Sequence, residues 1–91
     1  MKKSSAGTLE SGDILIEISP MEKSGAEITL QSIVAHQFGR KIKAVIRQTL
    51  KEMDVDGVSV NAIDKGALDC TVKARVATAV MRARGDETYS W

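Results

Sequence analysis

We consider three side chains of this sequence first as candidate nucleophiles or bases: Ser11, which lies in a glycine-flanked stretch, and the single histidine and cysteine, His36 and Cys70. A serine hydroxyl attacks a substrate only after a general base takes its proton. His36 is the only histidine, and no residue pattern joins it to Ser11 in a catalytic triad. We therefore expect Ser11, which lies in a short stretch flanked by glycines, to be presented but not activated. That is typical of a serine that another enzyme modifies. The alternative is that Ser11 is simply exposed to solvent and is not modified.

Cys70 and His36 are expected to have structural positions rather than catalytic ones. The apolar alternation around Cys70 places it on the inner face of a strand, as a small buried side chain. His36 is expected to be an exposed helix residue. A zinc site needs several histidine or cysteine ligands, and this sequence has one histidine and one cysteine. The segment 54–57, which carries two carboxylates, is too short for a calcium loop and lacks its distal glutamate. Because the sequence also lacks a phosphate-binding or dinucleotide glycine motif, we predict no catalytic residue and no metal site.

Four basic residues recur at helical steps of three and four and form what we term the basic stripe: Arg40, Lys43, Arg47 and Lys51. This stripe lies opposite the apolar side of the predicted helix. Its simplest interpretation is a solvated helix face. The alternative is a docking surface for an acidic partner or an anionic group.

The composition limits the class of protein. A chain of 91 residues with 43% apolar residues fits one small domain. The formal net charge of +1 gives no general attraction to nucleic acid or to a membrane surface. The single cysteine fits a reducing cytosol, the N-terminal residues lack the apolar run of a secretory signal, and no stretch approaches the roughly 18 apolar residues of a membrane span. We expect a cytoplasmic protein that binds neither nucleic acid nor membranes.

Apolar periodicity predicts the elements. Alternation predicts strands over 13–19, 27–31, 58–63 and 67–72, of which the first two are expected to pair antiparallel and the last two to form a hairpin around 64–66. Helical spacing predicts a long helix that Ser32 can cap and a second helix over 73–84. The predicted apolar positions of the long helix are Val34, Phe38, Ile42, Val45, Ile46, Leu50 and Met53.

The predicted order is strand, strand, helix, strand, strand, helix. It indicates an α+β fold with a four-stranded, mainly antiparallel sheet and two helices packed on one face. Residues 1–12 are small and polar, and we expect them to form a flexible arm that carries Ser11. Residues 13–85 are expected to form the single α+β domain, and residues 86–91 a polar tail.

Three motifs, in order along the chain, resemble the citrate lyase acyl carrier protein family, the gamma subunit of that complex. Residues 6–13 (AGTLESGD) resemble the attachment motif of the family. Residues 37–39 (QFG) resemble the start of its helix, residues 64–70 (DKGALDC) its hairpin, and Arg75 fits the segment that follows. The resemblance covers the chain up to about residue 85.

This resemblance implies that Ser11 carries 2'-(5''-phosphoribosyl)-3'-dephospho-CoA through a phosphodiester, because Ser11 follows Thr-Leu-Glu. The thiol of that group would hold acetyl and citryl thioesters. The implied partners are the citrate lyase alpha subunit, which exchanges acetyl for citrate, the beta subunit, which cleaves citryl to oxaloacetate, and a prosthetic-group transferase. The chain itself would be a non-catalytic carrier. Ser4 and Ser5 do not match the motif.

Two alternatives remain open from the sequence. The first is a non-covalent adaptor module that docks through the basic stripe. The second is an enzyme that uses Cys70 or His36, which would require a reactive thiol in the folded protein.

Overall fold

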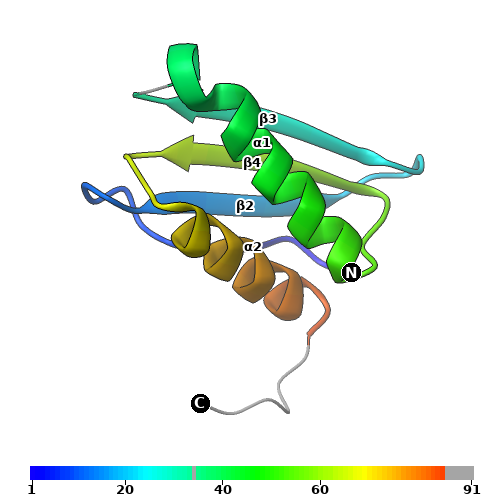
Figure 1. Ribbon diagram of the computed structural model, residues 1–91. Coiled ribbons are helices and arrows are strands. Elements are labelled where there is room, and N and C mark those ends of the chain that lie inside the picture. Colours follow the sequence, from blue (N-terminus) through cyan, green and yellow to red (C-terminus); the bar gives the residue numbers. More distant parts are fainter. Residues whose placement is uncertain (34, 86–91) are drawn as a thin grey trace.

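Two helices cover one face of a four-stranded sheet (Figure 1). The computed structural model describes residues 1–33 and 35–85, apart from the side chains of residues 35 and 36. Along the chain the elements are β1 (Ser4–Ala6), β2 (Ile14–Pro20), β3 (Ala26–Ser32), α1 (Ala35–Glu52), β4 (Val58–Asp64) and α2 (Asp69–Ala83). The predicted α+β class is therefore confirmed.

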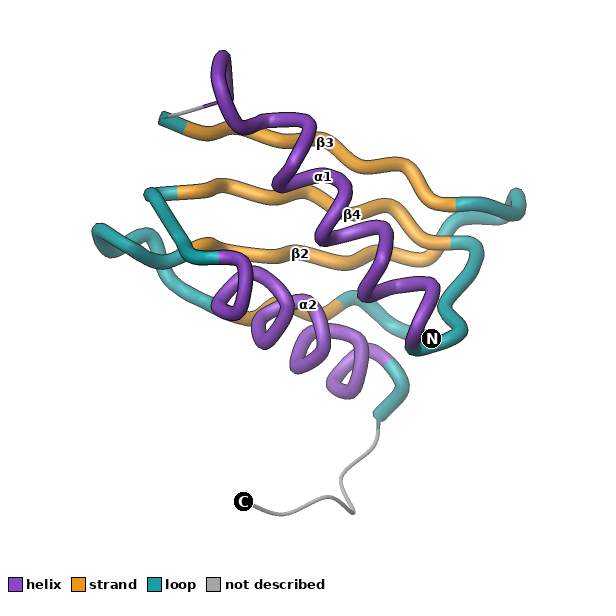
Figure 2. Tube along the Cα trace, viewed as in Figure 1, coloured by secondary structure: helices purple, strands orange, loops and turns teal. Residues whose placement is uncertain are grey.

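The strands lie in the order β1-β2-β4-β3 (Figure 2). Strand β2 is antiparallel to both β1 and β4, whereas β3 is parallel to β4. The predicted pairing of the strands over 13–19 and 27–31 is wrong, because β4 lies between them. Helix α1 returns the chain to the end of the sheet where β3 began, so the strands before and after it run in the same direction.

The core lies between the helices and the covered face of the sheet. Alternate residues of β2, namely Ile14, Ile16 and Ile18, are almost fully buried, as their alternation predicted. Full burial of such a side chain contributes roughly 1.5–3 kcal/mol. The helices and β4 complete the core with Ile42, Ile46, Leu50, Val58, Val60, Ala62, Val72, Val76, Ala79, Val80 and Ala83. Most of the apolar side of α1 that the sequence predicted therefore faces the sheet; Val34 lies outside the described residues.

The predicted strand over 67–72 is instead the start of a helix. Helix α2 begins at Asp69 and so includes the predicted helix over 73–84 almost entirely. At the end of β4 the buried carboxylate of Asp64 accepts hydrogen bonds from the backbone N–H of Ala67 (2.9 Å) and from Ser32 Oγ (2.7 Å). These bonds fix a connection into a helix rather than a hairpin. The observed order is accordingly strand, strand, strand, helix, strand, helix.

Strand β1 lies inside residues 1–12, for which no strand was predicted. Ser4 Oγ donates a hydrogen bond to the carbonyl of Ala79 (2.6 Å), and the backbone N–H of Lys2 donates to the carbonyl of Ala83 (2.8 Å). The chain before Ser11 is thus bonded to β2 and to α2, and Ser11 lies in a loop between two neighbouring strands. The predicted tail over 86–91 lies outside the described residues.

Candidate functional site

Ser11 is exposed in the loop that joins β1 to β2, here called the Ser11 loop (residues 7–13). Inside this loop the backbone N–H of Asp13 donates to the carbonyl of Glu10 (3.0 Å), and the N–H of Glu10 donates to Thr8 Oγ1 (3.2 Å). Within the described part of the chain the Ser11 hydroxyl has no hydrogen-bond partner. The loop therefore presents this hydroxyl to solvent, and none of the described residues is hydrogen-bonded to it as a base.

A glycine is required where the chain enters the Ser11 loop. Gly7 has φ of +100°, and a Cβ added there would lie 1.8 Å from the carbonyl oxygen of Ile14. Side chains other than glycine rarely adopt such a φ, and here the backbone of β2 also blocks the space. Gly12, on the other side of Ser11, has φ of +84° but open space around it. The two glycines turn the chain on both sides of the serine.

Asp13 fixes the base of the loop. Arg75 Nε donates to Asp13 Oδ1 (3.0 Å) and Arg75 Nη2 donates to Asp13 Oδ2 (2.8 Å), which makes a bidentate ion pair. The same carboxylate accepts hydrogen bonds from Thr8 Oγ1 (2.7 Å) and from the backbone N–H of Ile14 (2.8 Å). Arg75 is the main reason that the pKa of Asp13 lies well below its usual range, and the bonds from Thr8 and Ile14 act in the same direction. The ion pair thus joins the first of the three motifs, which contains Asp13, to the segment that follows the last one, which contains Arg75.

The loop is also bonded to the connection between β4 and α2. The backbone N–H of Gly12 donates to the carbonyl of Lys65 (2.7 Å), and the N–H of Lys65 donates to the carbonyl of Asp13 (2.8 Å). These two bonds and the ion pair hold the loop by its base. Ser11 therefore projects from a fixed position at the end of the sheet where β3 and β4 finish.

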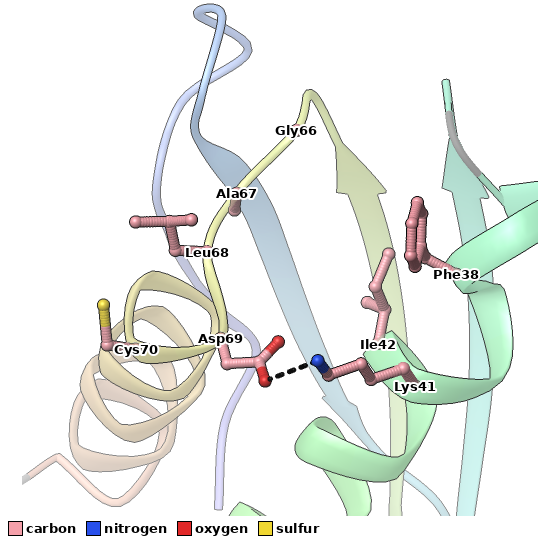
Figure 3. Close-up of a pocket in the computed structure, with 8 residues that line it drawn as sticks. All are labelled: Phe38, Lys41, Ile42, Gly66, Ala67, Leu68, Asp69 and Cys70. Carbon is pink, nitrogen blue, oxygen red and sulfur yellow. Dashed lines mark ion pairs between the residues drawn. The ribbon is translucent and has the colours of Figure 1, made fainter.

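A pocket of about 580 Å³ lies beside that connection, between it and the first turns of α1 (Figure 3). Phe38 and Ile42 reach it from α1, and Ala67 faces them from the connection. An ion pair between Lys41 Nζ and Asp69 (3.5 Å) spans one side. The remaining lining residues are Gly66, Leu68 and Cys70.

Two side chains, Cys70 and Phe38, differ from their predicted surroundings. Cys70 is exposed, because it lies on the first turn of α2 and not on the inner face of a strand. Phe38 was predicted on the apolar side of the helix, yet 49% of its surface is exposed. Its ring lines the pocket, which the helical spacing alone could not indicate. The His36 side chain lies outside the described residues, and those described contain no group of three potential metal ligands.

The basic stripe runs along α1 away from the Ser11 loop. Arg40, Arg47 and Lys51 are exposed, and Lys43 is half-buried. Arg47 and Lys51 line a shallow hollow that includes Ala26, the first residue of β3. Because β3 starts at the end of the sheet opposite the Ser11 loop, these two cations lie far from the serine. The end of α1 nearer to the serine contributes Lys41 to the pocket.

Comparison with known proteins identifies the family. A family model described as malonate decarboxylase delta subunit, an acyl carrier protein (ACP) family, matches residues 1–83. The citrate lyase acyl carrier protein of Latilactobacillus sakei subsp. sakei is 54% identical over 86 residues, which are 94% of this chain and 84% of the relative. That of Streptococcus mutans is 51% identical with the same coverage, and that of Streptococcus uberis is 52% identical over 91 residues, 100% of this chain and 89% of the relative. This chain belongs to the citrate lyase acyl carrier protein family.

Membership of this family confirms the predicted resemblance and the predicted role of a non-catalytic carrier subunit. An acyl carrier of this family implies a covalently bound prosthetic group and further subunits of a complex. Among solved structures, homoserine kinase from Cytophaga hutchinsonii superposes with a TM-score of 0.63 at 11% identity, over 96% of this chain and 36% of the kinase. That likeness concerns the fold alone. None of the described helices has the length and apolar character to cross a membrane.

Proposed function

We propose that Ser11 is the attachment point of 2'-(5''-phosphoribosyl)-3'-dephospho-CoA, joined to Ser11 Oγ through a phosphodiester, and that the chain carries acyl groups for citrate lyase. The observation that carries this proposal is the exposed Ser11 hydroxyl on a loop with a fixed base. When bound, the group supplies a thiol for acetyl and citryl thioesters.

The surroundings of Ser11 suit a residue that another enzyme modifies. Gly12 adds no side chain beside the serine, and a Cβ there would meet nothing within 4 Å. Leu9 and Glu10, which precede it, are exposed. A transferase can therefore approach the hydroxyl from solvent, and the transferase would have to supply the base, since no described residue is hydrogen-bonded to Ser11.

The fixed base of the loop gives the carrier function its geometry. The ion pair of Asp13 with Arg75 and the bond from Gly12 to Lys65 hold the point from which the prosthetic group extends. A group anchored in this way meets the active sites of a complex at a high effective concentration. We propose as partners the citrate lyase alpha and beta subunits and the prosthetic-group transferase, in the cytoplasm.

The basic stripe is proposed as a docking surface within that complex. Its residues Arg40, Arg47 and Lys51 are exposed, and for these three no ion pair is found within the described part of the chain. Unpaired cations along one helix favour contact with an acidic surface. Because the stripe leads away from the Ser11 loop, a subunit bound there would leave the serine accessible.

Mass spectrometry tests the attachment. Co-expression with the transferase should raise the intact mass of the chain by one prosthetic group, and Ser11→Ala should abolish the increase. Ser5→Ala is the matched control, since Ser5 is also exposed but lies in β1, and it should keep the increase. An unshifted wild-type mass, or an increase that survives Ser11→Ala, would contradict the proposal.

A further inference from the structure

We infer that the pocket between α1 and the β4–α2 connection binds the adenine ring of the prosthetic group. The inference rests on the proposed attachment at Ser11. It adds a resting position for a group that would otherwise extend freely into solvent, and it assigns a role to the exposed ring of Phe38.

The pocket lies close to the Ser11 loop. The Ser11 loop is hydrogen-bonded to Lys65 through the backbone N–H of Gly12 (2.7 Å), and the next residue, Gly66, already lines the pocket. By its chemical name, the prosthetic group has one phosphoribosyl unit between the serine oxygen and the 2' position of its adenosine. Adenosine is therefore the part of the group that follows directly after one phosphate and one ribose. Gly66 is exposed and has no side chain to obstruct the way from the loop to the pocket.

The lining of the pocket suits a planar base. Phe38 and Ile42 face Ala67 across the pocket, so its walls are mostly apolar (Figure 3). The volume of about 580 Å³ lies within the usual range of small-molecule sites, about 300–1,000 Å³. Nucleic-acid bases stack on aromatic side chains because every base has a planar π-face. A half-exposed phenylalanine beside aliphatic side chains offers such a platform.

A cation lies at the edge of the pocket. The Lys41 side chain is 66% exposed, and its ion pair with Asp69 (3.5 Å) lies at the edge of the pocket. An exposed ion pair of this kind contributes little to stability, so Lys41 can change partner at small cost. The diphosphate of the prosthetic group follows its adenosine, so a cation at the edge of the pocket suits the charge that lies next to the adenosine. Asp69 is the acidic group at the same edge.

The other candidate occupant is an apolar side chain of a partner subunit. The tether favours adenine, because a group attached at Ser11 is present at high effective concentration whether or not a partner is bound. Adenine would fill the pocket in the isolated, loaded chain, whereas a partner side chain would fill it only after the subunit binds. Measurements on the isolated chain therefore distinguish the two occupants.

Nuclear magnetic resonance of the full-length, isotopically labelled chain, loaded with unlabelled prosthetic group and checked by intact mass, tests the inference. We expect nuclear Overhauser effects from the adenine H2 and H8 protons to Phe38 and Ile42, and amide shifts at Gly66 and Ala67. Phe38→Ala should lower the ratio of docked to free adenine about 5- to 150-fold, the range that corresponds to loss of one base–aromatic stack. Phe38→Tyr, which keeps the ring, should retain docking. Thermal unfolding of the unmodified variants checks that both fold.

Each contrary result has its own meaning. A fully loaded chain with no adenine contacts and no amide shifts at the pocket would overturn the inference and leave the attachment at Ser11 intact. Shifts that arise only after lyase subunits are added would assign the pocket to a partner and also overturn it. A chain whose mass never increases would overturn the attachment and the pocket together.

Discussion

Replacement of Arg75 by alanine tests whether the ion pair with Asp13 fixes the base of the Ser11 loop. The substitution removes two charge-assisted hydrogen bonds, of 3.0 Å and 2.8 Å, from a carboxylate that is only 14% exposed. Asp13 would keep its bonds from Thr8 and from the backbone of Ile14. We therefore expect a loss of stability without complete unfolding.

The size of the loss follows from the exposure of the pair. A hydrogen bond to a charged group contributes about 1.5–3 kcal/mol, and solvent screening lowers the value where a partner is exposed. Because Arg75 is 39% exposed, we expect Arg75→Ala to lower the free energy of unfolding by about 1–3 kcal/mol in total. For a domain of this size each kcal/mol lowers the melting temperature by about 4–8 °C. Circular dichroism during thermal unfolding measures this change.

The pH dependence identifies the carboxylate as the cause. The pair with Arg75 lowers the pKa of Asp13 in the folded state, so its contribution is fully present above the usual aspartate pKa of about 3.9 and is lost as the pH falls below that value. In Arg75→Ala the pKa of Asp13 should move back toward its usual range. The difference in melting temperature between wild type and variant should therefore be largest near neutral pH and should shrink in acid.

Arg82→Ala is the matched control on the same helix. Arg82 Nη1 donates to the carbonyl of Ser5 (2.9 Å) and has no carboxylate partner within the described residues. We expect a smaller loss of stability that does not change between neutral and acidic pH. Equal losses for Arg75→Ala and Arg82→Ala, or a difference from wild type that persists unchanged in acid, would refute the role assigned to the ion pair.

Three further results are expected. Gly7→Ala should lower the melting temperature more than Gly12→Ala, because both sites have positive φ but only at Gly7 would the added Cβ lie 1.8 Å from a backbone oxygen; equal changes would contradict this reading of the loop. Cys70→Ser should change stability by no more than about 0.5 kcal/mol and leave the covalent loading of the prosthetic group intact, since Cys70 is exposed; lost loading would favour a reactive thiol. Removal of charge at Arg40 and Arg47 should weaken binding of the lyase subunits more at low salt than at high salt, and equal weakening would exclude an electrostatic role.

Local patterns in the sequence predicted much of the fold. The alternation of Ile14, Ile16 and Ile18 and the spacing of Ile42, Ile46 and Leu50 correctly indicated a strand and a helix, because each pattern follows directly from which side is buried. Failures occurred where pairing between distant segments decides the structure. Strand β1 has only three residues, too few for a pattern, and it exists because β2 and α2 bond to it.

The start of α2 shows why a short alternation misleads. Leu68, Cys70 and Val72 alternate like a strand, but only Val72 is buried, and the hydrogen bond from Ala67 to Asp64 directs the chain into a helix. In the site, too, the sequence indicated the features that depend on neighbouring residues but not the contacts between residues far apart in the chain. The sequence placed Ser11 among glycines and included Arg75 in the resemblance, but their connection through Asp13 and the exposed ring of Phe38 required the fold.

The most direct test of the central claim is the intact mass of the chain purified from its native host, followed by fragmentation that locates any added mass. The account predicts one added phosphoribosyl dephospho-CoA unit, confined to the peptide that contains Ser11. An unmodified chain from cells with active citrate lyase, or an added group on any other residue, would contradict it.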